Sequence, residues 1–457
     1  MTTEVPNLSL IQRGKERLND PKNAFMLVTS IRDVPGYTHN ITVVRDPYHP
    51  ALGGLREADA TRLLSDYENA DPIYTKRIME GRSVSSDIAA AGLLESFQLG
   101  GEMAVKHAGE VATMREGMDN HPEVYGDYRG EILGNRDAWL DAAKMFGGTK
   151  GIMVRNHPGA YAALTPQQQD RLWEQRAEHV IKLNEMKPTD DPRVVYYTAP
   201  DSGTDSDKMS RIRDYTGGKF VACYRVDEGG TGNPSPTTAL SVAYSTKALL
   251  HELGLNQDGT DVSFGIQGAA GEVGSVLVGL YYKNHPRAEL IITDMDRRRD
   301  ELERLSDQYG ANIVRPNDIF ESGIIFVPSG PPGQLNDRTR LLMVGAGVKG
   351  VSGPANYNWT AGHEKRLAEE FRMGGITVDP AELGNQGGIR SILPQFIEDI
   401  TGRRPSQEAA HQSVVDVEPM TRSVLEEARQ RGVTPDQAFH ERAIFEYATQ
   451  CRELGLL

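Results

Sequence analysis

A glycine-rich turn, a helix and a later acid form the pattern in this sequence with the clearest chemistry. An apolar run at 262–267 leads into the turn, and a second apolar run ends at Asp294, 26 residues after Gly268. Glycines let a pyrophosphate approach the backbone, the helix N-terminus supplies unpaired N–H groups, and the acid accepts hydrogen bonds from a ribose. The pattern predicts a dinucleotide-binding site with the residues Gly268, Ala270, Gly271, Glu272, Val273 and Asp294.

The residues around this turn bear on which dinucleotide binds. The glycines Gly268, Gly271 and Gly274 have the spacing GxxGxxG, one residue longer than GxGxxG, which changes the expected geometry of the loop. Asp294 favours NAD, because a carboxylate repels the 2′-phosphate of NADP. The arginines at 297–299 either hold such a phosphate or form a solvated helix face. We therefore expect NAD, with NADP as the alternative.

Further segments have residue orders typical of one enzyme family. They are YYTAPDSGT at 196–204, GGTGNPSPTTA at 229–239, ALGGLR at 51–56, FVPSG at 326–330, LND at 335–337, VSGPAN at 351–356 and ELGNQGGI at 382–389. In order and approximate spacing, the chain resembles the glutamate, leucine, phenylalanine and valine dehydrogenases, most densely between 190 and 390. The resemblance implies two α/β domains and hydride transfer between a nicotinamide and the α-carbon of an amino or imino acid.

The resemblance also implies roles for individual residues. Asp201 matches a carboxylate that serves in proton transfer, and a positioned carboxylate suits oxidative deamination, which moves protons to and from nitrogen and water. Thr238 matches a threonine that contacts the nicotinamide amide, and Asn356 matches an asparagine near nicotinamide and substrate. The remaining matches are Gly53 and Gly54 at the substrate, and Ser329 and Asn385 at the cofactor.

The family uses two lysines, and only one has a clear match. Lys150, in FGGTKGIMV at 146–154, matches the lysine that activates the carbonyl or water. The second lysine, expected twelve residues earlier, binds the substrate carboxylate, but Ala138 stands there. Arg136 or Lys144 would then supply the cation, and Gly134 permits the helix break that Arg136 requires. The resemblance thus implies an atypical substrate.

A competing alignment places AAAGLLESFQLGGEMAV, at 89–105, on the lysine segment and puts Met103 at the lysine position. On either alignment the chain between ALGGLR and APDSGT is roughly fifty residues too long, and such loops usually carry a lid, an interface or a substrate wall. Apolar residues at helical spacing predict a largely helical insertion within 57–145; they are Leu93, Leu94, Phe97 and Val105.

The helices and strands that must position the candidate site residues follow a different order in each of three regions of the chain. Residues 1–230 are expected to form an α/β substrate and oligomerisation domain. Its expected elements are a strand at 40–44, a Pro/Gly loop at 47–56, a helix that begins with a capping box at Thr165 and ends at about 186, and a strand at 194–197. Strands alternate with helices through 231–400, which predicts a parallel Rossmann-type sheet with strands at 262–267, 290–293, 313–314, 324–327 and 341–344. Residues 401–457 are expected to be helical, with a second capping box at Thr434.

Length and composition exclude several classes of protein. A chain of 457 residues is too long for one core, and the net charge of −14 argues against nucleic acid as a partner. No apolar run approaches the roughly eighteen residues of a membrane span, and the N-terminus has no secretory pattern, so we expect a cytoplasmic protein. Two cysteines, Cys223 and Cys451, and eleven scattered histidines predict reduced thiols and no metal site.

Three classes of function remain. The first is an NAD(P)-dependent amino-acid dehydrogenase, a homo-oligomer acting on the CH–NH2 group of a small amino-acid-like substrate. The second is a diverged relative that reduces another imine or performs a non-redox step with bound NAD(P). The third is a non-catalytic nucleotide-binding homologue. Lys150 and Asp201 argue against the third class, whereas the missing second lysine favours the second.

Overall fold

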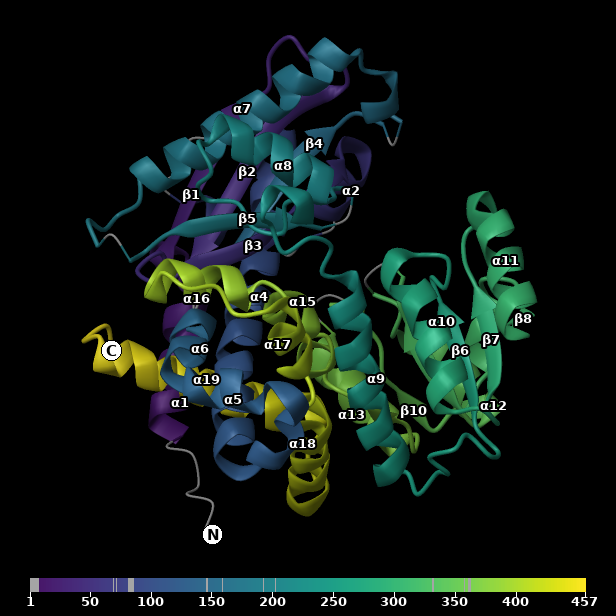
Figure 1. Ribbon diagram of the computed structural model, residues 1–457. Coiled ribbons are helices and arrows are strands. Elements are labelled where there is room, and N and C mark those ends of the chain that lie inside the picture. The colour runs from purple at the N-terminus through teal and green to yellow at the C-terminus, as the bar shows by residue number, and fades with distance from the viewer. Residues whose placement is uncertain are drawn as a thin grey trace. The chain divides into compact units, whose positions relative to one another are not determined.

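The computed structural model describes residues 8–68, 70, 72–80, 86–144, 147–157, 159–191, 193–201, 203–330, 333–356, 358–360 and 363–457. The chain forms two compact units, whose elements are labelled in Figure 1. Unit 1 comprises 1–108, 142–233 and 443–457, and unit 2 comprises 109–141 and 234–442. Helices α4 (Asp87–Asn120) and α19 (Pro435–Glu453) therefore each contribute residues to both units.

Unit 1 is built on a five-stranded mixed sheet of order β1-β2-β4-β3-β5. β2 pairs antiparallel with β1 and β4, whereas β3 pairs parallel with β4 and β5. The strands are β1 (Ala24–Ser30), β2 (Tyr37–Arg45), β3 (Ala51–Asp59), β4 (Gly147–Arg155) and β5 (Tyr196–Pro200). β3, β4 and β5 run in one direction, but β5 is shorter: its last residue, Pro200, pairs with Leu55, which pairs with Gly151. Asp201 therefore follows β5 at the level of the middle of β4.

Helices cover both faces of the unit 1 sheet. Met153 and Leu55 pack with α7 (Pro166–Glu185) and α8 (Ser206–Tyr215) on one face. Ile152 and Val154 pack with α2 (Ala60–Glu68) and the first part of α4 on the other face. Side chains alternate along a strand, so Lys150 lies on the α4 face, and Thr149 and Gly151 lie on the α7 face.

The start of α7 confirms its predicted capping box. The Thr165 side chain accepts a hydrogen bond from the Gln168 backbone, and the Gln168 side chain accepts one from the Thr165 N–H. The other helices that begin in unit 1 are α1 (Leu8–Asn19) and α3 (Pro72–Met79).

Unit 2 contains the predicted parallel sheet. Its strand order is β11-β10-β9-β6-β7-β8, and every neighbouring pair is parallel. The strands are β6 (Ser263–Gln267), β7 (Glu289–Thr293), β8 (Asn312–Ile313), β9 (Ile325–Pro328), β10 (Gly350–Val351) and β11 (Thr377–Val378). This is the doubly wound order of a Rossmann-type domain, so the α/β fold class is confirmed.

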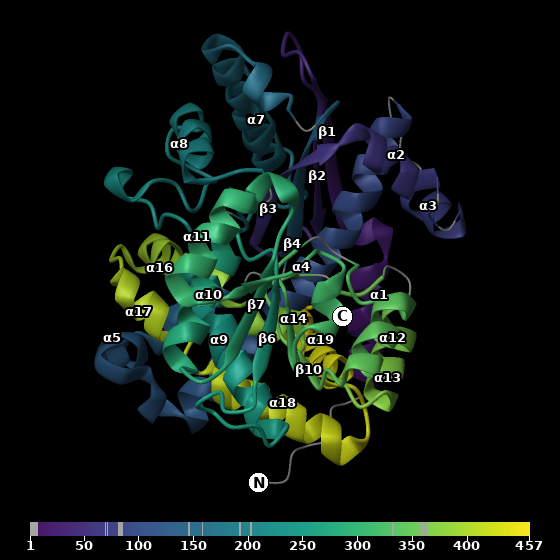
Figure 2. The ribbon, with the colours of Figure 1, turned by 90° about the vertical axis from the view of Figure 1, so that its right-hand side faces the viewer.

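Helices cover both faces of this sheet as well. Figure 2 shows its strands between α9 (Ser235–Glu252), α10 (Glu272–Asn284) and α11 (Arg299–Tyr309) on one side and α12 (Asp337–Ala346) and α13 (Glu364–Met373) on the other. Phe264 and Ile292 join the core under α9 and α10, whereas Val351 packs with Phe371 of α13. Burial on both faces explains why these strands are continuous apolar runs.

The region of the expected insertion is helical, as the apolar spacing predicts. It contains α2, α3, the 34-residue α4, α5 (Arg129–Gly134) and α6 (Arg136–Ala143). Residues 109–141 of this region are grouped with unit 2, whereas we expected the insertion to pack on the substrate domain. The C-terminal part is also helical, with α14 (Ala381–Gly384), α15 (Gly387–Arg390), α16 (Leu393–Thr401), α17 (Gln407–Gln412), α18 (Val417–Arg431) and α19.

Two element predictions are wrong. Residues 51–56 form the start of β3, where Ala51 and Leu55 are fully buried and the backbone pairs on both sides, so the glycines belong to a strand and not to a loop. Residues 341–344 lie in α12, which begins at a capping box of Asn336 and Thr339 and leaves Leu341 63% exposed. Among the described helices, none combines the length and hydropathy needed to cross a membrane.

Candidate active site

Lys150 and Asp201 form an ion pair where the short strand β5 ends, level with the middle of β4. Lys150 is a β4 residue with a side chain only 7% exposed, and Asp201 follows β5 with a side chain 22% exposed. The structure thus brings together the amine and the carboxylate that the family resemblance assigned to catalysis. Met103, the alternative to the lysine, lies within helix α4.

The turn that carries Asp201 is held by neighbouring strands. The Asp201 N–H donates to the Thr204 hydroxyl at 2.8 Å, and this hydroxyl donates to the Leu55 carbonyl of β3 at 2.6 Å. Gly203 has φ +86°, and a Cβ there would lie 3.1 Å from the Glu57 carboxylate. The Thr204 hydroxyl therefore holds the backbone of Asp201 in place. The motif APDSGT includes this threonine, but the sequence alone does not show that it has this role.

Sequence reasoning missed a buried acid beside this turn. Glu57 pairs with Arg155 at 2.6 Å and accepts a hydrogen bond from the Tyr37 hydroxyl at 2.6 Å. Burial, followed by the Glu57 charge, raises the pKa of Tyr37 well above its usual value. These residues come from β2, β3 and the end of β4, so their contact depends on strand pairing that local spacing does not show.

The glycine turn of unit 2 has no room for side chains at two positions. Gly268 has φ +69°, and a Cβ there would overlap the Ser329 carbonyl, while a Cβ at Gly274 would overlap the Gly268 carbonyl. Gly271 is the N-cap of α10 and offers no side-chain cap to the helix. The N–H groups of the first turn are therefore suited to an anionic ligand such as a pyrophosphate.

Asp294 lies beside this turn, as its sequence position predicts. Its carboxylate accepts hydrogen bonds from the Ala270 N–H at 3.0 Å and from the Met295 N–H at 2.7 Å. Arg298 donates to the Ala270 carbonyl at 2.7 Å, so one of the three arginines contacts the turn as well. A carboxylate, of Asp294, and a guanidinium, of Arg298, therefore both lie beside the expected position of the ribose.

Four more predicted cofactor residues belong to unit 2. The Asn385 amide donates to the Asn356 side chain at 2.6 Å. A Cβ at Gly388 would lie 3.1 Å from the hydroxyl of Thr238, in the first turn of α9. Ser329 follows β9 and donates its N–H to the Gln267 carbonyl at 3.1 Å. Ser329 thus follows a parallel strand and Thr238 lies at the start of a helix, positions at which doubly wound domains bind their ligands.

The predicted substrate residues are less closely grouped. Gly53 and Gly54 lie in β3 and pair with Thr198 and Ala199 of β5. Arg136 begins α6 after the helix break that Gly134 permits, but it belongs to unit 2 and pairs with Asp119 at 2.7 Å. The proposed binding of a substrate carboxylate by Arg136 stays a prediction.

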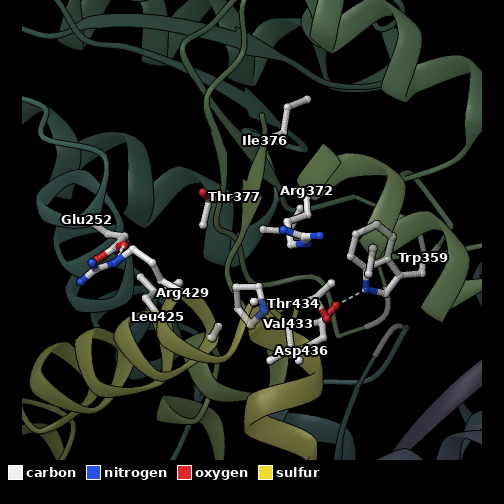
Figure 3. Close-up of a pocket in the computed structure, with 15 residues that line it drawn as sticks. Glu252, Trp359, Arg372, Ile376, Thr377, Leu425, Arg429, Val433, Thr434 and Asp436 are labelled. Carbon is white, nitrogen blue, oxygen red and sulfur yellow. Dashed lines mark hydrogen bonds and ion pairs between the residues drawn. The ribbon is translucent and has the colours of Figure 1, made fainter. Parts of the chain in front are cut away.

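A pocket of about 240 Å³ lies elsewhere in unit 2 (Figure 3). Trp359 and Asp436 are joined across it by a hydrogen bond of 2.7 Å, and Arg372 and Arg429 also line it. Each arginine already pairs with a glutamate, Glu369 and Glu252 respectively. None of the predicted site residues lines this pocket.

One buried group of potential metal ligands occurs among the described residues. Ligand atoms of Asp46, His49 and Cys451 lie within 4.8 Å of one another. However, Arg17 donates two hydrogen bonds to the Asp46 carboxylate, each at 2.9 Å. A carboxylate that is already paired with a guanidinium is poorly placed to bind a cation.

The parallel sheet, the glycine turn and the following acid define the fold of dinucleotide-binding proteins. No protein-family model matches the chain. Over 205 residues, 44% of this chain, it is 31% identical to leucine dehydrogenase of Bacillus cereus and 28% identical to phenylalanine dehydrogenase of Lysinibacillus sphaericus. These matches cover 52% and 51% of the two relatives, so the matched region spans about half of their length.

Two solved structures are similar over nearly the whole chain. L-tryptophan dehydrogenase from Nostoc punctiforme aligns with a TM-score of 0.59 and 20% identity over 97% of this chain and 99% of its own. A hetero-hexameric glutamate dehydrogenase from Thermus thermophilus aligns with a TM-score of 0.64 and 18% identity over 98% of both chains. These two structures confirm the fold. The resemblance to amino-acid dehydrogenases is confirmed by the sequence matches to leucine and phenylalanine dehydrogenase.

Proposed function

We propose that this chain is an NAD(P)-dependent oxidoreductase that deaminates an amino acid oxidatively or runs the reverse reaction. The observation that carries the proposal is the Lys150–Asp201 ion pair, which joins an amine of β4 to a partly exposed carboxylate at the end of β5. Such a pair suits a reaction that moves protons to and from nitrogen and water. The named relatives, leucine and phenylalanine dehydrogenase, support the same chemistry.

In the proposed mechanism each residue has a limited task. Asp201 takes and returns protons, because its carboxylate is reachable from solvent and its backbone is fixed by Thr204. Lys150 is held by Asp201 and supplies positive charge to a substrate oxygen. The nicotinamide cofactor, when bound, accepts or donates the hydride.

The described residues fit a dinucleotide in unit 2. The glycine turn at 268–274 would hold the pyrophosphate, because it lacks side chains where they would clash and leaves the start of α10 uncapped. Asp294 would accept hydrogen bonds from the adenine ribose, and Thr238, Asn356 and Asn385 would lie toward the nicotinamide. We propose NAD as the preferred cofactor on the position of Asp294.

A screen for NADH formation across amino acids tests the activity. We expect turnover with at least one substrate, and we expect Asp201→Asn to lower it at least about a hundredfold while NADH still binds. Asp207→Asn is the matched control, since Asp207 is an exposed acid of the neighbouring helix α8. Wild-type protein that binds NADH but turns over no amino acid or imine would favour the non-catalytic class.

The substrate carboxylate needs a cationic partner, and we propose Arg136 for this task. A buried unpaired carboxylate costs several kcal/mol, so Arg136→Ala should raise KM by about tenfold or more without loss of NADH binding. Arg129→Ala, at an exposed arginine of α5, is the control. Unchanged KM and kcat in Arg136→Ala would remove Arg136 from the site.

We also propose that the chain forms a homo-oligomer, as the resemblance implies. The glutamate dehydrogenase of Thermus thermophilus is named as a hetero-hexamer. Light scattering of the purified protein would give the mass directly, and a monomer of 50.3 kDa would contradict the proposal.

A further inference from the structure

The core of unit 1 contains a cation without a carboxylate partner. Arg176, in the middle of α7, is only 2% exposed. Its Nη1 donates to the Thr42 hydroxyl at 3.2 Å, and its Nε has no hydrogen-bond partner. Among the described residues, no carboxylate forms an ion pair with Arg176.

The groups around this guanidinium do not balance its charge. His179, one turn further along α7, bonds to the hydroxyls of Thr42 and Thr29 through its two ring nitrogens. Burial and then the nearby Arg176 charge lower the pKa of His179 well below its usual value, so this ring is neutral. Burial also lowers the pKa of Arg176 to about 9, which still leaves it charged at neutral pH.

A small cavity adjoins the guanidinium. Its volume is about 10 Å³, enough for the centre of one water-sized sphere. Thr42, Thr149, Gly151 and Thr198 line it together with Arg176. The hydroxyls of Thr149 and Thr198 are buried and have no hydrogen-bond partner in the described part of the chain.

We propose that unit 1 binds one small monatomic anion, of the chloride type, between Arg176 and the hydroxyls of Thr149 and Thr198. A buried charge costs several kcal/mol unless it is paired, and a single anion would pair with the guanidinium and accept from both hydroxyls. A water molecule would satisfy the hydroxyls but would leave the charge unbalanced. The small volume favours a monatomic ion over sulfate or phosphate.

The site has a defined relation to the catalytic strand. Thr149 and Gly151 flank Lys150 on β4, and alternation places the anion on the face of the sheet opposite to the Lys150 side chain. The anion would therefore join α7 to β4 and β5 from behind the active site. Its role is to stabilise unit 1, and it takes no part in the reaction.

Thermal unfolding in sodium chloride and in sodium glutamate, at equal ionic strength, tests the proposal. From 10 to 200 mM, chloride or bromide should raise the Tm by roughly 3 °C more than glutamate does. The same difference should persist in Arg171→Met, whose exposed arginine lies five residues earlier on α7. It should vanish in Arg176→Met, and this variant should melt at or above the wild type in 10 mM chloride, because it no longer buries a charge.

Two further measurements test the anion site without the Arg176→Met variant. Thr149→Val keeps the shape of the side chain but removes one donor, and it should reduce the chloride effect. Crystals soaked in bromide should show one anomalous peak between Arg176 and Thr198. Equal effects of chloride and glutamate, an undiminished chloride effect in Thr149→Val, or no bromide peak would each overturn the proposal.

Discussion

Asp294 is the residue on which the choice of cofactor depends. Its carboxylate is fixed by two backbone N–H groups, while Arg298 contacts the carbonyl of the same turn. We expect Asp294→Ser to weaken NAD binding and to favour NADP relatively, because the change removes the charge that repels a 2′-phosphate. Fluorescence titrations with NADH and NADPH measure this shift. A wild-type preference for NADP of tenfold, about 1.4 kcal/mol, would mean that the arginines outweigh Asp294.

Asp379 gives the protein a pH-dependent stability. It follows β11, accepts hydrogen bonds from the hydroxyls of Ser245 and Ser352, and is 3% exposed. Burial raises its pKa to about 7, from about 3.9 in an unfolded chain. The folded state therefore binds the proton more tightly, and stability from this group falls as pH rises from about 4 to about 7, by up to about 4 kcal/mol.

The variant Asp379→Asn isolates this contribution. An amide stays neutral at every pH, so the stability of the variant relative to wild type should rise between pH 5 and pH 8. Urea unfolding at both values measures the change, with Asp337→Asn at an exposed acid as the control. Equal pH dependence in wild type and Asp379→Asn would show that Asp379 is ionised in the folded protein.

At the scale of elements, α4 and β4 of unit 1 pack backbone against backbone. A Cβ at Gly148 would overlap the Gly100 carbonyl and the Ala104 backbone nitrogen. Gly148→Ala should therefore separate helix from strand and lower the free energy of unfolding by about 3 kcal/mol or more. Gly130→Ala, at a helical glycine with no atom within 4 Å of the added Cβ, should leave stability unchanged or raise it by about 0.5–1 kcal/mol. Denaturant titration of both variants measures these changes in the free energy of unfolding.

The sequence predicts elements well where local signals and periodicity agree. The helix after Thr165 has its cap in the sequence, and the strands of unit 2 are apolar runs that end at the predicted site residues. The glycines of β3 predict a turn, whereas pairing with β4 and β5 makes this segment a strand. The surroundings of Glu57 and Arg176 could not be predicted from the sequence for the same reason, because the groups that contact them come from elements far apart in the chain.

At the scale of the whole molecule, the last part of the chain completes unit 1. Tyr447 of α19 donates a hydrogen bond to Asp46, and Cys451 lies against the same carboxylate. Burial alone would raise the pKa of Asp46, but hydrogen bonds from His49 and Arg17 hold it well below the usual range. Both Tyr447 and Cys451 are almost fully buried, so they belong to the core of this unit.

A chain that ends at Arg442 should therefore lose structure in unit 1. Hydrogen exchange in β2, which ends beside Asp46, should become faster than in the full chain, although β2 is far away in the sequence. Tyr447→Phe is the control, because it removes one hydrogen bond at a cost of about 1–3 kcal/mol and leaves the helix in place. Unchanged exchange in the shortened chain would mean that unit 1 is stable without α19.

The same arrangement imposes a delay during translation. Residues 443–457 leave the ribosome only after the whole of unit 2 has been made, whereas the rest of unit 1 is available from residue 233 onward. At about 5–20 residues per second, the nascent chain spends roughly ten to forty seconds with Asp46 uncovered by α19. During that interval Gly14 also lacks the helix surface of Ile444 and Ala448 against which it packs. The partly made chain thus presents an incomplete apolar face, the kind of surface that chaperones bind, until α19 emerges.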